Sequence, residues 1–209
     1  MSAEEKIKLD LINKFNIPAE KTEREITAAL EMIARFDGAD RGYLYLYRPE
    51  EGCVRKLCAW KGRGIVSLAD LDTPYYIKDF APTIRSLLKM EAIHVSDVAG
   101  ASGKADPLIK IHRKMGTKSF LMVPMSYRKA LFGIIGFDSV REKRLWNDEA
   151  ISLLKIVGEV FTSALQRKSF ENTLADNEER FRRIFEESPV ALWEQDYSKV
   201  KGALEALKK

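Results

Sequence analysis

The stretch "SFLMVPMSYRKALFGIIGFDS", Ser119 to Ser139, contains two apolar runs joined by the short polar segment "SYRK". Both runs are apolar at consecutive positions, so hydrophobic side chains point to both faces of each strand. Strands of this kind lie in sheets that are covered on both sides. Pro124 cannot donate to a strand ladder and predicts a strand end or a bulge at that point. The stretch therefore predicts a hairpin at the centre of a two-sided antiparallel sheet.

The second apolar run stops at Asp138, and the basic residues Arg141, Lys143 and Arg144 follow before Trp146. One interpretation is an anion-binding site on the three bases. A phosphate cradle, however, needs a glycine-rich loop that leads into a helix N-terminus, and the glycines here lie within the strand. We therefore expect Asp138 to end the strand and turn its carboxylate toward the basic loop, with Trp146 covering the sheet edge.

An earlier hairpin is predicted from "GYLYLY", the turn sequence "PEEG" and the returning run "CVRKLCAW". The first strand alternates Tyr43, Tyr45 and Tyr47 with leucines, so its two faces differ chemically. We expect the leucine face to meet helices. Cys53 and Cys58 are the only cysteines, and their spacing fits neither a redox pair nor a zinc site. Their odd separation predicts opposite faces of the strand, as two buried reduced thiols.

Helical periodicity appears on both sides of this hairpin. An N-terminal helix is predicted within residues 1–18, and "TEREITAALEMIARFDG" places Ile26, Ala29, Leu30 and Ile33 on one face before Gly38. A short helix is predicted from Pro82, a short strand in "EAIHVSDV", and a further helix in "ADPLIKIHRKMG". In that last helix Leu108, Ile111 and Met115 form the apolar stripe, and His112 is assigned to the polar flank.

A long helix is predicted from Asn147 or Asp148 to about Glu187. One stripe has the three-four spacing of a heptad coiled coil, and its predicted dimer positions are Leu153, Ile156, Val160, Phe170, Leu174, Asn177, Phe181 and Ile184. A second stripe of Leu154, Val157, Phe161 and Leu165 is confined to the first half. We therefore expect the first half to pack on its own sheet and the second half to pair with a twin chain.

Composition narrows the classes of function. The 35 basic and 31 acidic residues give a net charge of +4, and no basic block with interleaved aromatics predicts nucleic-acid binding. The charged N-terminus lacks the apolar core of a signal peptide, and no apolar run approaches the roughly 20 residues that cross a bilayer. A cytoplasmic chain without membrane insertion is the prediction.

The order of these elements resembles the GAF family of small-molecule sensor domains, most specifically in "GTKSFLMVPMSYRKALFGIIGFDSVREKRLWNDEAISLL". The resemblance implies an α+β fold: an antiparallel sheet between a layer of N- and C-terminal helices and a layer of loops and short helices, with a long C-terminal signalling helix. The tail after Glu187 is similar to the opening of a PAS domain. The predicted organisation is an N-terminal helix at 1–18, a GAF domain at 19–166, a coiled-coil linker at 167–187 and a truncated PAS start at 188–209.

The resemblance implies the sensory part of a bacterial signalling protein, a two-component sensor histidine kinase or a diguanylate cyclase, that binds a small molecule or mediates dimerisation. No catalytic output domain, catalytic residue or metal site is predicted in this chain. Two alternatives stay open. One is a thiol enzyme of the free methionine sulfoxide reductase type, which the strand position of Cys53 and Cys58 fits poorly. The other is a ligand-free dimerisation spacer.

A ligand, if bound, is expected on the second face of the sheet. The predicted lining is aromatic with one base: Tyr43, Tyr45, Tyr75, Tyr76, Phe80 and Arg85. The cofactor is left unassigned. Ile111 stands where bilin-binding relatives place a cysteine beside the histidine, which argues against a bilin. His94 and His112 stay open as haem ligands, and the signature of cyclic-nucleotide GAF domains is not apparent.

Overall fold

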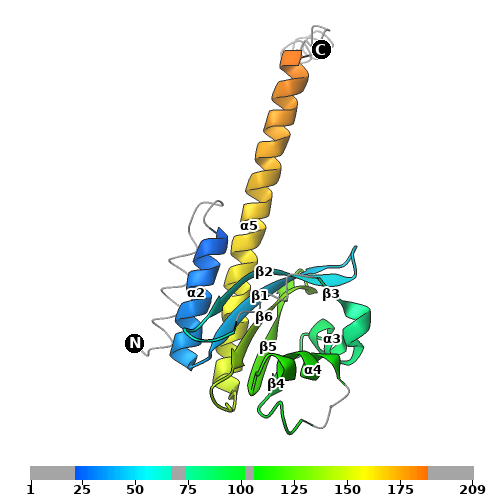
Figure 1. The fold of residues 1–209 in the computed structure, drawn as a ribbon. Coiled ribbons are helices and arrows are strands. Elements are labelled where there is room, and N and C mark those ends of the chain that lie inside the picture. The colour runs from blue at the N-terminus through cyan, green and yellow to red at the C-terminus, as the bar shows by residue number, and fades with distance from the viewer. Residues whose placement is uncertain (1–21, 67–73, 102–105, 188–209) are drawn as a thin grey trace, which may run out of the picture. The chain divides into compact units, whose positions relative to one another are not determined.

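The computed structural model describes residues 22–66, 74–101 and 106–187. The predicted N-terminal helix and the PAS-like tail lie outside them. The core of the fold is a six-stranded antiparallel sheet in the order β3-β2-β1-β6-β5-β4 (Figure 1). Its strands are β1 (Arg41–Arg48), β2 (Cys53–Lys61), β3 (Tyr75–Tyr76), β4 (Ile93–Val95), β5 (Ser119–Tyr127) and β6 (Ala130–Ser139).

The predicted central hairpin is confirmed as β5 and β6. Its two-residue turn, Arg128 and Lys129, has positive φ at both positions, the conformation that matches the twist of the flanking strands. Pro124 lies opposite Ile134 inside the ladder, and a bulge follows between Met125 and Ser126. The central pair of the sheet is β1 and β6, so β5 lies one strand away from the centre. Neighbouring residues of β5 and β6 nevertheless belong to different cores, Phe120 and Ile134 to one and Leu121 and Ile135 to the other, so both faces of the hairpin are covered, as its apolar sequence requires.

One face of the sheet packs on two helices, α2 (Thr22–Asp37) and the first part of α5 (Asp148–Glu187). This first core contains the predicted stripe of α2, Leu44 of β1, and Leu154, Val157, Phe161 and Leu165 of α5. Trp146 is also part of this core, at 6% exposure. Asn147 caps α5, because its side-chain oxygen accepts a hydrogen bond from the Ala150 amide. The leucine face of β1 therefore meets helices, as predicted.

The other face carries smaller elements: η3 (Ile77–Phe80), α3 (Ala81–Leu88) and α4 (Pro107–Lys114), drawn in green in Figure 1. Asp106 caps α4 by accepting a hydrogen bond from the Leu108 amide. The second core includes Tyr43 and Tyr45 of β1, Ile84 and Leu87 of α3, and Phe120 of β5. Alternation along β1 thus separates two cores that share one sheet as their wall.

A bulge corrects the prediction for the two cysteines. Cys58 pairs with Leu44, but Lys56 pairs with Tyr45, so Leu57 is an extra residue in β2. Cys53 pairs with Arg48, four residues from Leu44. An odd separation would place the two cysteines on opposite faces, but the extra residue shifts the alternation by one position and returns them to the same face. Both thiols therefore belong to the face that packs on α2 and α5. Both cysteines are free, as predicted, but only Cys53 is fully buried, whereas Cys58 is half-buried.

The chain divides into two units, Met1–Ser169 and Phe170–Lys209. The described part of the second unit is the end of α5, and its large apolar side chains are exposed: Phe170, Leu174, Phe181, Ile184 and Phe185. In the first unit, Leu153 of the predicted dimer stripe is buried in the domain's own core. Across the described ranges, every helix is too short or too polar to span a membrane.

Candidate functional site

The second face of the sheet encloses a cavity of about 60 Å³ against α3, α4 and η3. Its walls are largely apolar and aromatic. The lining residues are Tyr43, Tyr45, Val54, Tyr75, Phe80, Ile84, Leu87, Leu108, Ile111, His112, Met115, Met122 and Ile134. A concave, mostly apolar site with a few polar groups is the usual form of a small-molecule site.

Four of the six residues predicted to bind a ligand lie on this cavity: Tyr43, Tyr45, Tyr75 and Phe80. The other two do not. Tyr76 follows Tyr75 on β3 and therefore points to the opposite side, where it is 46% exposed. Arg85 follows Ile84 on α3 and is exposed, whereas Ile84 and Leu87 form the buried face of that helix.

The aromatic wall is a chain of edge-to-face contacts. Ring centroids are 5.6 Å apart for Tyr43 and Tyr45, 5.9 Å for Tyr45 and Tyr75, and 5.4 Å for Tyr75 and Phe80. This geometry places the positive edge of one ring against the negative face of the next and is favoured over face-to-face stacking. The rings therefore hold one another in position around the cavity.

A buried ion pair lies next to the cavity and was not predicted. Arg41 and Asp138 are both 0% exposed, and Arg41 Nη1 donates to Asp138 Oδ2 at 3.2 Å. The Tyr43 hydroxyl donates to Asp138 Oδ1 at 3.2 Å, and Thr117 Oγ1 lies 3.3 Å from Asp138 Oδ2. Arg41 also donates to the carbonyl oxygens of Met115 and Val66. A buried charge pair requires such additional partners to offset its desolvation.

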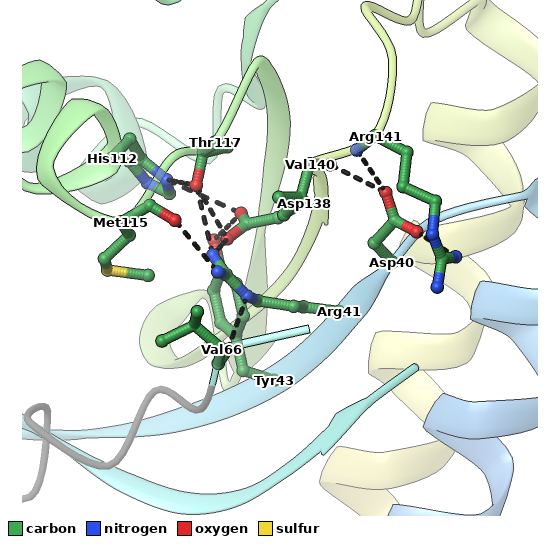
Figure 2. Close-up of polar contacts among 10 residues, drawn as sticks. All are labelled: Asp40, Arg41, Tyr43, Val66, His112, Met115, Thr117, Asp138, Val140 and Arg141. Carbon is green, nitrogen blue, oxygen red and sulfur yellow. Dashed lines mark hydrogen bonds and ion pairs between the residues drawn. The ribbon is translucent and has the colours of Figure 1, made fainter. Parts of the chain in front are cut away.

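Strand β6 ends next to Asp138, as predicted, but the predicted direction of the carboxylate is wrong. Figure 2 shows the Asp138 carboxylate directed toward Arg41, Thr117 and His112 rather than toward the basic loop. Two other acids pair with that loop. Asp40 accepts hydrogen bonds from the Val140 and Arg141 amides and from Arg141 Nη1 at 2.6 Å, and Asp97 accepts one from Lys143 Nζ at 2.6 Å. Asp40, directly before β1, and Asp138, near the end of β6, thus point to different partners. The sequence does not reveal which of the two carboxylates pairs with which basic side chain.

The prediction for His112 is also wrong, because the side chain is 4% exposed instead of lying on a polar flank. Its ring stacks on Phe120 at a centroid distance of 3.9 Å. Nδ1 lies 3.5 Å from Asp138 Oδ1 and 3.4 Å from Thr117 Oγ1. Burial lowers the pKa of His112, and nearby Arg41 lowers it further, although Asp138 acts in the opposite direction. The imidazole is therefore neutral at pH 7.

A signal for His112 was present in the sequence. His112 lies four residues after Leu108 and three before Met115, so it lies on the same helical face as the predicted stripe. The polarity of the residue obscured this spacing.

Gly136 explains how Tyr43 reaches Asp138. The two residues are paired across β1 and β6, and a Cβ atom on Gly136 would lie 2.1 Å from Tyr43 Cε2. Only glycine therefore lets the tyrosine ring lie across β6 and extend its hydroxyl to Asp138. The same ring forms part of the cavity wall, so this glycine shapes both the cavity and the buried network.

Tyr75 is another residue of the cavity wall with a polar group. Its hydroxyl oxygen is buried and has no hydrogen-bond partner within the described ranges. Burial raises the pKa of Tyr75 to about 12, so the phenol is neutral. Buried hydroxyl groups in folded proteins are nearly always hydrogen-bonded, which makes this one a candidate contact for a bound molecule.

The arrangement does not form a nucleophilic triad. A triad needs the acid on one imidazole nitrogen and the nucleophile on the other, whereas Asp138 and Thr117 both face Nδ1 of His112. Neither cysteine lines the cavity. Burial raises the pKa of the Cys58 thiol to about 11, which leaves it a poor nucleophile. His94 is exposed on β4. In the part of the chain that is described, no three His, Cys, Asp or Glu side chains gather as metal ligands.

The model of the GAF domain family matches residues 22–165 of this chain. Among solved structures, the phycocyanobilin-bound GAF domain of a cyanobacterial phytochrome superposes with a TM-score of 0.66 at 18% identity, covering 82% of this chain and 98% of that one. The chromophore-binding domain of a bacteriophytochrome from R. palustris gives 0.66 at 15% identity, covering 80% and 61%. The blue-light absorbing form of the Thermosynechococcus elongatus PixJ GAF domain gives 0.56 at 16%, covering 75% and 94%. No match was found among curated proteins.

Proposed function

Because this chain belongs to the GAF domain family, we propose that it is the sensory module of a bacterial signalling protein, and that it binds a small molecule in the cavity beneath Tyr43 and Tyr75. The observation that carries the proposal is the cavity itself, which combines an aromatic wall with the unpartnered hydroxyl of Tyr75. By their own descriptions, the similar phytochrome domains bind phycocyanobilin or a chromophore and the PixJ domain has a blue-light absorbing form. The shared fold supports a sensory role here.

A bilin or a haem does not fit the residues present. The cavity of about 60 Å³ is well below the roughly 300 Å³ at which pockets for drug-sized ligands begin. No cysteine lines it, and Ile111 precedes His112, so a thiol for attaching a bilin is missing from the wall. His94 lies on the surface, and Nδ1 of His112 faces Asp138 and Thr117. We therefore propose a ligand smaller than the tetrapyrroles of the similar structures.

The shared sheet offers a route from the cavity to helix α5. On β6, Ile134 lines the cavity and its neighbour Ile135 packs in the first core with α2 and α5. Strand β5 contacts α5 directly. Met125 of β5 lies so close to Gly158 of α5 that a Cβ atom added to the glycine would lie 3.1 Å from the methionine side chain. Because the two cores share these strands, a ligand that shifts β5 or β6 also shifts α5. Packed interfaces respond to such shifts by changing between discrete arrangements.

We further propose that the end of α5 forms a parallel coiled coil with a second copy and passes the shift to an output domain of the histidine kinase or diguanylate cyclase type. The support is the heptad spacing of Phe170, Leu174, Phe181 and Ile184, whose side chains are 61%, 61%, 64% and 49% exposed. Asn177 in the same stripe is typical of a polar position that selects register in dimers. A ligand-free spacer would share this dimer but would lack a response to ligands.

Two measurements test the proposal. A metabolite library is screened by thermal unfolding of the 209-residue chain, where a binding compound raises the Tm. Light scattering at tens of micromolar is expected to give a dimer for the native chain and a monomer for Leu174→Glu. Asn172→Glu, on the same exposed helix but outside the stripe, is the matched control and is expected to stay dimeric. A monomeric native chain contradicts the coiled coil, and a library without any hit favours the spacer.

The thiol-enzyme alternative has a direct test of its own. Because both cysteines belong to the face that packs on α2 and α5, reduction of free methionine sulfoxide with a thiol donor is expected to stay at the background rate. A rate that depends on Cys53 or Cys58 would favour the enzyme instead.

A further inference from the structure

The polar groups of the cavity restrict the chemistry of its ligand. Among the described residues that line it, none is Lys, Arg, Asp or Glu. Asp138, which contacts the lining residues Tyr43 and His112, is paired with Arg41, and both charges are fully buried. A charged ligand would therefore lose its hydration without meeting an opposite charge, which is strongly unfavourable. An uncharged ligand does not meet this barrier.

His112 adds an acceptor to the wall. A carboxylate can only accept a hydrogen bond, so the Nδ1 that faces Asp138 carries the proton of the neutral ring. The other ring nitrogen, Nε2, then has a lone pair and accepts a hydrogen bond. The contacts that the structure describes for this ring use Nδ1 or the ring face. A ligand with an O–H or N–H group complements this arrangement.

Tyr75 carries the second polar group of the wall, a hydroxyl that is itself buried. Its hydroxyl both donates and accepts, and it has no partner in the part of the chain that is described. Its ring belongs to the aromatic chain that continues through Tyr45 and Phe80. Tyr75 therefore offers a polar tip on a rigid apolar support, which suits a planar ligand with one polar substituent.

The size of the cavity points to a single ring. A water-sized group needs roughly 10–15 Å³ by the same measure, so about 60 Å³ admits a few such groups. Met115 and Met122 also line the wall, and flexible methionine side chains adjust to ligands of slightly larger volume.

We propose that the cavity binds a small uncharged aromatic molecule of one ring that carries a single O–H or N–H group, and that Tyr75 recognises this polar group. The proposal rests on the proposed sensory function and specifies its ligand class. It also identifies Tyr75 as a residue that determines specificity, because a site that hydrogen-bonds a polar substituent rejects the analogue that lacks it.

The test compares three probes on the 209-residue chain by calorimetric titration: phenol, toluene of nearly the same shape, and benzoate with a charge. Phenol is expected to bind most tightly. Tyr75→Phe removes only the hydroxyl, so the affinity for phenol is expected to fall about two- to tenfold, the range of a single neutral hydrogen bond. Toluene binding is expected to be unchanged. Tyr76→Phe, on the exposed side of β3, is the matched control and is expected to behave as the native chain.

The outcomes separate the ligand class from the sensory function. Benzoate binding more tightly than phenol, or equal phenol affinity in Tyr75→Phe and the native chain, overturns the ligand class but leaves a binding cavity. If none of the three probes binds and the metabolite library also yields nothing, both proposals fail. If Tyr75→Phe does not fold, the affinities of the native chain for phenol and toluene are compared instead. Equal affinities for the two probes overturn the proposed ligand class.

Discussion

The buried pair of Arg41 and Asp138 yields a prediction with a defined magnitude. Asp138→Asn keeps the shape of the side chain but removes its charge, and it leaves Arg41 charged at 0% exposure. The carbonyl oxygens of Met115 and Val66 still accept hydrogen bonds from Arg41 but do not neutralise it. Breaking a buried pair on one side typically costs about 3–5 kcal/mol. The free energy of unfolding is expected to fall by that amount.

Urea unfolding followed by circular dichroism measures this change. Glu31→Gln, which breaks the exposed pair with Arg35 on α2, is the control and is expected to cost less than about 1 kcal/mol. The double variant Arg41→Met with Asp138→Leu replaces both charges by apolar side chains of similar size. It is expected to be more stable than Asp138→Asn, because no isolated charge stays buried.

Two results would refute this reasoning. If Asp138→Asn costs no more than Glu31→Gln, the carboxylate does not compensate Arg41 in the folded chain. If the costs of Arg41→Met and Asp138→Leu simply add in the double variant, the two side chains do not interact. A coupling of about 0.5–3 kcal/mol is expected for residues in direct contact.

Three further predictions concern the neighbouring groups. Gly136→Ala is expected to destabilise the chain by about 1–3 kcal/mol in urea unfolding, because the added methyl overlaps the Tyr43 ring; Gly158→Ala, which meets only a flexible side chain within a helix, is expected to cost less. The pKa of His112 lies below its ordinary value of 6.5 in the folded chain, so the unfolded chain takes up the proton first; stability is expected to be complete above about pH 6.5 and to decline as the pH falls toward the folded-state pKa. His112→Gln is expected to remove that part of the decline, and identical pH profiles of the two chains would contradict a neutral buried imidazole. Burial raises the pKa of Cys58 to about 11, so its thiol is expected to react with a thiol reagent at pH 8 more than tenfold faster in denaturant than in the native chain. Equal rates would show that the thiol is not protected in the folded chain.

Local patterns in the sequence predicted the elements of the fold well. The alternation of Tyr43 and Tyr45 with leucines, the apolar stripe of α2 and the helix start at Asn147 or Asp148 each depend on neighbours within a few residues. Backbone geometry converts such spacings directly into faces of a strand or a helix. The same local reasoning identified the tyrosine face of β1 as one wall of the cavity.

The sequence by itself therefore determined the strands, the helices and the apolar faces that pack together, because these follow from residues that are close in the chain. Only the tertiary structure decided which acidic side chain forms an ion pair with which basic side chain. Arg41 and Asp138 are 97 residues apart, and a contact over that distance depends on the register of β1 against β6. One bulged residue in β2 likewise changed the face of a cysteine. Long-range polar partners depend on the sum of every turn and bulge between them, whereas periodicity reports only the local backbone.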